Sequence, residues 1–109
     1  MSRAKGDIAE TLAVKFLLDE GYRILEQNFY SRFGEIDIIA LKEEVVHFIE
    51  VKSASSYEQA IRNITPSKIG KLTKTLHVYL KKSKLELDYQ LDAIIVVDST
   101  CEMLESITL

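Results

Sequence analysis

The beginning of the chain shows a helical pattern of apolar residues followed by a strand pattern. Ile8, Leu12 and Phe16 recur every fourth residue, with alanines beside them, which predicts a helix over residues 4–20. Residues 22–29 then mix aromatic and branched side chains with polar ones, which is typical of a β-strand. The chain is therefore expected to open with a helix that leads directly into a sheet.

Two further strand patterns follow at residues 35–40 and 45–52, with only four residues between them. A hairpin is the simplest connection over so short a distance. If Glu43 and Glu44 form a two-residue turn, the residues on either side of them face each other and the register of the hairpin is fixed.

A second helix with a clear start lies in the second half of the chain. Thr65 is a residue type that caps helix N-termini, and proline is favoured at the first helical position, so we expect a helix from Pro66 to about Lys82. Its apolar residues fall within an arc of about 100°, and its lysines lie on the other side. The remaining expected elements are a short helix at 57–63, a strongly apolar strand at 89–97 and an edge strand at 103–108.

This order of elements predicts an α/β fold with a central mixed sheet of about five strands flanked by helices. The length of 109 residues is ordinary for one domain, so we expect a single domain over residues 1–109. No apolar run approaches the roughly 20 residues that span a bilayer, so no membrane partner is expected. The single cysteine, Cys101, excludes a disulfide within the chain and fits a reducing cytoplasm.

Charge is unevenly distributed along the chain, although the net charge is only −3. Residues 62–84 contain seven basic residues and no acidic one, whereas the rest of the chain contains seven basic and 17 acidic residues. A basic helix face of this kind can contact the phosphates of DNA or RNA, and the alternative is an ordinary solvated helix face. The candidate nucleic-acid contacts are Arg62, Lys68, Lys71 and Lys74.

The strand over residues 45–52 carries an acid and a base on one face. Side chains alternate between the faces of a strand, so Glu50 and Lys52 project on the same side. The hairpin register also places Asp37 opposite Glu50 and Glu35 opposite Lys52. Two facing carboxylates repel each other unless one is protonated or a cation lies between them, and Mg²⁺ prefers such oxygen ligands. The alternative is structural: an ion pair between Glu35 and Lys52, with the other two acids at a hydrated end of the sheet.

Asp37 followed by Glu50-Val51-Lys52 fits the nuclease pattern in which an aspartate precedes an acid-x-lysine sequence by a variable gap. Together with the surrounding stretches 28–40 and 48–52, this pattern resembles the bacterial YraN-like family. By that resemblance the chain is similar to the PD-(D/E)XK, or restriction-endonuclease-like, superfamily and to its Holliday-junction resolvases. The similarity covers most of the chain.

The resemblance implies a role for each residue of the pattern. Asp37, Glu50 and the backbone carbonyl of Val51 would hold Mg²⁺ or Mn²⁺, and Lys52 would orient the attacking water or stabilise the charge of the transition state. Glu10, from the first helix, would reach the same cluster as a further ligand or as an acceptor behind the ligands. The implied activity is hydrolysis of phosphodiester bonds in DNA, branched DNA included, or in RNA.

Two other interpretations stay open at this point. One is a non-catalytic nucleic-acid-binding module of the same fold. The other is a protein-interaction scaffold in which the acidic cluster no longer has a role. One basic helix is a small footprint for nucleic acid, so a homodimer or a partner protein would enlarge the contact surface.

Overall fold

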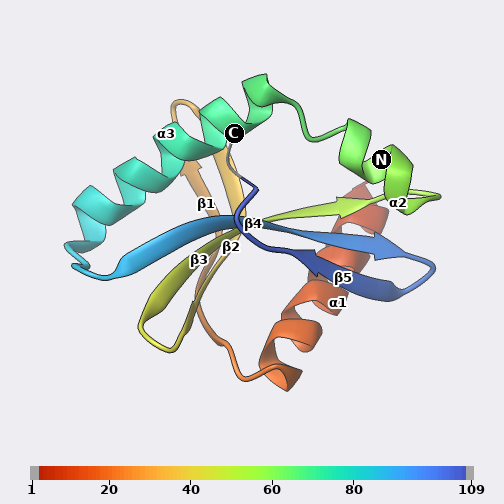
Figure 1. The fold of residues 1–109 in the computed structure, drawn as a ribbon, viewed down its shortest axis with the longest axis horizontal. Helices are drawn as coiled ribbons and strands as arrows, with labels where there is room; N and C mark the ends of the chain where they lie inside the picture. Colours follow the sequence, from red (N-terminus) through yellow and green to blue (C-terminus); the bar gives the residue numbers. More distant parts are fainter. Residues whose placement is uncertain (1–2, 108–109) are drawn as a thin grey trace.

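The computed structural model describes residues 3–107, and their side chains from Asp7 onward. Three helices and five strands make up this part of the chain (Figure 1). The helices are α1 (Arg3–Asp19), α2 (Tyr57–Arg62) and α3 (Pro66–Ser83). The strands are β1 (Arg23–Ser31), β2 (Gly34–Lys42), β3 (Val45–Ser53), β4 (Asp88–Val97) and β5 (Thr100–Leu104).

The five strands form one sheet whose spatial order follows the chain, β1-β2-β3-β4-β5. Neighbouring strands are antiparallel except β3 and β4, which are parallel because α2 and α3 carry the chain back between them. α1 covers one face of the sheet, and α2 and α3 cover the other (Figure 1). The predicted α/β fold with a mixed five-stranded sheet is confirmed, and it is compatible with a restriction-endonuclease-like fold.

Local sequence signals set both ends of α3. The Thr65 side chain accepts a hydrogen bond from the Lys68 amide at 3.3 Å, and Pro66 occupies the first turn, as predicted. At the other end, Lys84 adopts a left-handed φ of 58° and donates its amide to the Leu80 carbonyl. The buried face is the predicted one and contains Ile69, Leu72, Leu76 and Tyr79.

The β2–β3 hairpin has the predicted two-residue turn. Glu43 and Glu44 adopt positive φ angles of 51° and 66°, and Lys42 pairs with Val45. Positive φ at both central residues is what a type I′ turn requires, and that turn matches the twist of the strands it joins. Because β2 and β3 pair up to the turn, the two glutamates adopt positive φ angles, which asparagine and glycine adopt more readily.

Apolar side chains fill both sides of the sheet. On the α1 side, buried residues come from that helix and from β2, β3 and β4. On the α3 side, the rings of Tyr79 and Tyr89 pack edge-on against Phe48 at 5.7 and 6.3 Å. α2 adds a smaller cluster around Ala60 on the same side. The ends of the strands and the outer edges of the sheet are then the places where polar side chains can gather.

The buried stripe of α1 differs from the prediction by one position. The helix buries Ala9, Ala13 and Leu17, and it leaves Ile8 60% exposed. Small alanine side chains let the helix lie close to the sheet, so the larger residues pack at the border of the contact. No helix in the described part of the chain is long and apolar enough to cross a lipid bilayer.

The last strand runs from Thr100 to Leu104, and the predicted span of 103–108 is wrong over the described residues. Residue 108 lies outside them. Asp98 and Ser99 adopt φ angles of 49° and 65° and form a turn that reverses the chain directly after β4. The sequence contains no glycine there to indicate so tight a turn.

Candidate metal centre and nucleic-acid interface

Asp37 lies where the pairing of β2 with β3 comes apart. Regular pairing ends at Ile38 and Ile49, so the predicted ladder pair of Asp37 with Glu50 is not formed. Instead, Asp37 Oδ2 accepts a hydrogen bond from the Val51 amide at 2.8 Å. The aspartate side chain thus takes the place of a backbone acceptor, and this holds its carboxylate at the split between the strands.

The alternation of side chains along β2 also changes at this point. Ile36 and Ile39 both pack on the α3 side although they are three residues apart, and Ile38 packs on the α1 side. Irregularities of this kind redirect the side chains they carry and are frequent beside active sites. Here the irregularity accompanies the turn of Asp37 toward the end of β3.

The carboxyl groups of Asp37 and Glu50 meet between the two strands. Burial, a hydrogen bond to the Glu50 carboxyl and the charge of that carboxyl raise the pKa of Asp37 to about 8, while the Val51 amide acts in the opposite direction. Two carboxyls in contact are stable only if they share a proton or a cation. Without a cation, the neighbouring Glu50 carboxyl therefore favours the protonated form of Asp37.

Lys52 lies beside this pair, with its Nζ 3.6 Å from Glu50 Oε2. The two side chains are 26% and 15% exposed, so water only partly screens their interaction. The alternative in which Lys52 pairs with Glu35 across the strands is wrong, because β2 and β3 have already separated there. The ammonium group is therefore placed next to the acids at the strand split.

Glu10, Glu35 and Asp37 form the other side of the cluster, and each offers a carboxylate oxygen within 4.8 Å of the others. Asn28, in β1, has a left-handed φ of 54°. With its amide nitrogen turned toward the acids, Asn28 donates to Glu10 Oε1 at 3.1 Å and to Glu35 Oε1 at 3.2 Å. Burial and the charges of Asp37 and Glu35 raise the pKa of Glu10 to about 7. We call Glu10, Glu35, Asp37 and Glu50 the acidic cluster.

The sequence pattern by itself indicates no role for Asn28, although asparagine is depleted in strands. That depletion is the signal that could have drawn attention to it, because a strand asparagine with a left-handed backbone needs a local reason. The reason in the structure is its contact with two acids from different elements.

The acidic cluster fits a divalent cation that prefers oxygen ligands. Its donors are all carboxylates, and they come from α1, β2 and β3. Mg²⁺ and Mn²⁺ take such ligands together with water and phosphate oxygens. A cation at this position would remove the repulsion that raises the pKa of Asp37. The backbone of Val51, whose carbonyl is the third predicted ligand, already contacts Asp37 through its amide.

A polar groove of about 660 Å³ extends from Lys52 between the end of β3, α2 and the start of α3. Lys68 lines it on the α3 side and donates from Nζ to the Asn63 carbonyl at 2.8 Å. Hydrogen-bonding groups and two cations are the features that contact a sugar–phosphate chain. The other polar residues of the lining are Ser53, Ser55, Gln59 and Asn63, and Asp98 adds one acid.

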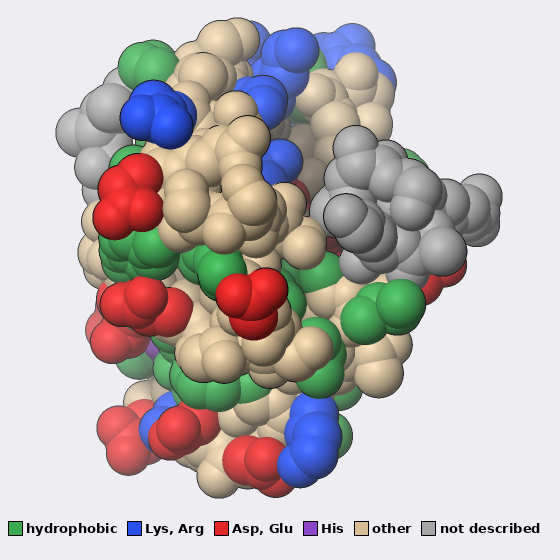
Figure 2. Space-filling view, turned by 90° about the vertical axis from the view of Figure 1, so that its right-hand side faces the viewer, with side chains coloured by type: hydrophobic (Ala, Val, Ile, Leu, Met, Phe, Trp, Pro, Cys, Tyr) green, Lys and Arg blue, Asp and Glu red, His purple; other side chains and the backbone are tan. Residues whose placement is uncertain are grey.

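The other candidate nucleic-acid contacts lie on the outer surface of the helices. Lys71 and Lys74 are exposed on α3, and Arg62 is exposed at the end of α2. Figure 2 shows lysine and arginine side chains over the upper part of the molecule, where Figure 1 places α2 and α3, and acidic side chains mixed with some basic ones over the lower part. Of the four predicted contacts, the structure places Lys68 in the groove beside Lys52, and it places the other three on the outer helix surfaces.

Comparison with known proteins assigns the chain to a family. The model of a family described as "Uncharacterised protein family UPF0102" matches residues 9–96. The chain belongs to this family. The matched stretch contains the whole acidic cluster, and the YraN-like resemblance seen in the sequence is confirmed at this level.

Relatives from several bacteria match the UPF0102 chain along its whole length. A UPF0102 protein of Sulfurimonas denitrificans is 63% identical over 109 residues, which is all of both chains. One of Helicobacter hepaticus is 57% identical over 99% of this chain and 97% of its own. One of Aliarcobacter butzleri is 50% identical over all of both chains.

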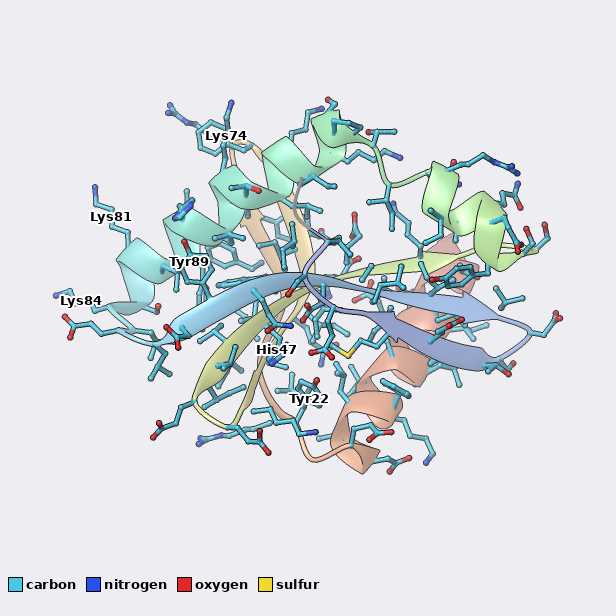
Figure 3. The ribbon with its side chains drawn as sticks, viewed as in Figure 1. Tyr22, His47, Lys74, Lys81, Lys84 and Tyr89 are labelled. Carbon is cyan, nitrogen blue, oxygen red and sulfur yellow. The ribbon has the colours of Figure 1, made fainter. Side chains whose placement is uncertain are left out.

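In this UPF0102 protein, β3 also supplies a buried polar network through His47, on the face of the strand opposite Glu50. His47 Nδ1 lies 2.6 Å from Asp92 Oδ2, and Asp92 is fully buried. Asp92 Oδ1 accepts hydrogen bonds from the Gln90 side chain and the Ser106 amide, both at 2.8 Å. The Tyr22 ring packs edge-on against His47 at 5.0 Å, and the two side chains lie together in Figure 3.

Strand alternation puts His47 on the face of β3 opposite Glu50, but nothing in the sequence pattern connects it with Asp92. The two residues are 45 positions apart and meet only because β3 and β4 are parallel neighbours. A single histidine and a single aspartate, each inside an otherwise apolar strand, are the signal that could have revealed the pair.

Proposed function

We propose that this UPF0102 protein is a metal-dependent endonuclease of the PD-(D/E)XK type that hydrolyses phosphodiester bonds of DNA or RNA. The observation that carries the proposal is the meeting of Asp37 and Glu50 at the split between β2 and β3, with Lys52 beside them. Partly buried acids that repel each other cost stability, and such groups are concentrated at catalytic and ligand-binding sites.

The acidic cluster would hold Mg²⁺ or Mn²⁺, with Asp37 and Glu50 as central ligands. Bound there, the cation would polarise the scissile phosphate and lower the pKa of a water molecule. Lys52 would donate hydrogen bonds to the attacking water or to the phosphate oxygens and stabilise the negative charge that develops on them. Asn28 keeps Glu10 and Glu35 in their orientations through its two hydrogen bonds.

The groove beside Lys52 supports a nucleic-acid substrate. It begins at the candidate catalytic lysine and continues along Lys68, so a phosphate at the acidic cluster would have neighbouring phosphates near a second cation. The other exposed cations on α2 and α3 would add contacts outside the groove. A homodimer or a partner protein would enlarge this surface further.

Cleavage of labelled duplex, branched and single-stranded DNA and RNA tests the proposal. We expect cutting with Mg²⁺ or Mn²⁺ and none in EDTA. Lys52→Ala should reduce the rate by at least about 100-fold, as removal of one group that stabilises transition-state charge commonly does. Lys15→Ala is the matched control, because Lys15 also pairs with an acid, Asp19 at 3.0 Å, but on the exposed surface of α1.

Two results would contradict the nuclease proposal. Equal activity of Lys52→Ala and Lys15→Ala would trace the cutting to a contaminating enzyme. Salt-sensitive binding of nucleic acid with no cutting by the wild-type protein would favour the non-catalytic binding module instead.

A further inference from the structure

A line of contacting side chains crosses the end of the sheet from β3 to β1. Lys52 contacts Glu50 at 3.6 Å, and both Glu50 and Glu35 hydrogen-bond with Asp37. Tyr30 in turn hydrogen-bonds with Glu35 and is its partner in the β1–β2 register. Tyr30 therefore extends this line onto β1, the outer strand of the sheet.

The ring of Tyr30 is open to solvent. At 70% exposure it is the most exposed large hydrophobic side chain of the described residues. Phe29 packs on the α3 side and Ser31 contacts Thr75 of α3, so strand alternation puts Tyr30 on the opposite side of β1. The hydroxyl is held at the acidic cluster, and the ring faces outward next to it.

The turn that follows this tyrosine carries positive charge. The Arg32 guanidinium lies 4.8 Å from the centre of the Phe33 ring, and Lys74 Nζ lies 5.5 Å from it. A contact of 2.8 Å between Ser31 Oγ and Thr75 Oγ1 ties the turn to α3 beside Lys74, which Figure 3 shows projecting outward from the helix. These cations therefore lie on the α3 side of β1, at the turn that follows Tyr30 in the chain.

We propose that the Tyr30 ring stacks on the base of an unpaired nucleotide next to the phosphate at the acidic cluster. The substrate is then a nucleic acid with a single-stranded segment at the cut. This inference rests on the proposed function, because the acidic cluster positions the phosphate. Neighbouring strands lie about 4.8 Å apart, so β1 is within one or two nucleotides of the split between β2 and β3. Bases inside a duplex have both faces covered, so only an unpaired base offers a face to the ring.

Binding of short labelled single strands of DNA and of RNA, and of the matching duplexes, tests this proposal by fluorescence anisotropy in EDTA. Tyr30→Ala should weaken single-strand binding about 5- to 100-fold, the range that base–aromatic stacking contributes. Tyr30→Phe should stay within about twofold of wild type, because it keeps the ring and removes only the hydroxyl. Duplex binding should change by less than about twofold in both variants.

Tyr89→Ala is the matched control, because Tyr89 is 46% exposed but lies on β4 beside Val46, at the end of β3 away from Glu50. It should leave single-strand binding unchanged. Circular dichroism of each variant establishes that it is folded before binding is compared. If the DNA and RNA arms differ, the stronger arm identifies the sugar of the natural substrate.

The proposal is overturned if Tyr30→Ala binds single strands like wild type, if Tyr30→Phe loses as much as Tyr30→Ala, or if duplex binding falls equally. Cleavage assays with Mg²⁺ test the proposed nuclease activity independently of the stacking role of Tyr30. A wild-type protein that cuts while Tyr30→Ala binds normally keeps the nuclease and excludes the stacking role. A protein that never cuts but loses single-strand binding in Tyr30→Ala keeps the stacking role and excludes the nuclease.

Discussion

The His47–Asp92 network and the acidic cluster both include a residue of β3, but they differ in whether their acids have hydrogen-bond partners or face other acids. β3 sends His47 to one face, where Asp92 receives three hydrogen bonds, from the imidazole, an amide side chain and a backbone amide. Three residues later, β3 sends Glu50 to the strand split, where it meets Asp37. In the His47–Asp92 network, both carboxylate oxygens of Asp92 have hydrogen-bond partners. In the acidic cluster, the carboxyl groups of Asp37 and Glu50 repel each other.

The difference separates a structural role from a functional one. A satisfied buried network can contribute to stability and to a unique arrangement of the chain, and here it fastens the segment after β5 through Ser106. Acids that repel each other contribute nothing to folding until a cation or a proton joins them. The two groups should therefore respond in opposite directions when one of their members is removed.

The largest expected effect is on the His47–Asp92 network. His47→Leu leaves the fully buried Asp92 carboxylate without its imidazole partner, so the free energy of unfolding should fall by about 3–5 kcal/mol. Urea unfolding followed by circular dichroism measures the change. His77→Leu is the control, because His77 is exposed on α3 and its removal should change stability by less than about 0.5 kcal/mol. Equal effects of the two substitutions would contradict the stabilising role of the His47–Asp92 network.

The next effect is on the acidic cluster, which should gain stability from a cation. At pH 8, Mg²⁺ or Mn²⁺ at 100 times its dissociation constant should stabilise the wild-type protein by about 2.7 kcal/mol. Thermal unfolding with and without EDTA measures it. Asp37→Asn should lose most of this gain, since it removes a central ligand. A gain that survives in Asp37→Asn would show that the cation binds elsewhere.

The pH dependence of the metal-free protein should have a sign that distinguishes the two groups. The pKa of Asp37 is raised from 3.8 to about 8 in the folded chain. The folded state therefore holds this proton more tightly than the unfolded state, and the stabilisation is lost as pH rises from about 4 to 8. The pKa values of Glu10 and Glu35 are also raised, so these acids add to the loss in the same direction.

Unfolding in EDTA across this pH range tests the expectation. Asp37→Asn should flatten the profile and be more stable than wild type at pH 8, in contrast to the loss expected for His47→Leu. A wild-type profile as flat as that of Asp37→Asn would mean that Asp37 is already ionised in the folded chain. This result would contradict the proposed difference between the acidic cluster and the His47–Asp92 network.

The sequence predicted the parts of this structure that depend on local chemistry. Thr65 and Pro66 mark the start of α3 through capping, and the pattern of apolar residues along that helix identifies its buried face. The hairpin turn at Glu43 and Glu44 follows from its length and from the two strand patterns beside it. These features need only neighbours within a few residues.

The parts that sequence reasoning missed depend on contacts between distant segments. The pairing of β2 with β3 stops before Asp37 because the Asp37 carboxylate replaces a backbone acceptor, and no local pattern indicates this. Asn28 meets Glu10 only after α1 packs on the sheet, and His47 meets Asp92 only after β3 and β4 pair. The identity of the candidate metal ligands was accessible from the sequence, whereas their supporting contacts were not.

The smallest expected effect concerns the two ends of α3, which should differ if the acidic cluster is where a nucleic acid arrives. Lys68, Lys71 and Lys74 lie in the half of the helix that begins at the groove, and Lys81 and Lys82 lie in its last turn. Each lysine that touches a phosphate of single-stranded DNA contributes about 0.7 to the slope of log K against log salt concentration, so replacing the first three with alanine should reduce the slope by roughly two.

Replacing Lys81, Lys82 and Lys84 together with alanine is the matched control, because it removes the same charge from the far end of the same helix. Titration of labelled single-stranded DNA at several salt concentrations gives both slopes. If the two triple variants reduce the slope equally, the whole helix acts as a diffuse positive surface. The orientation of the substrate toward the acidic cluster would then have to come from Lys52 and the groove alone, because the far lysines would attract the chain as strongly as the near ones.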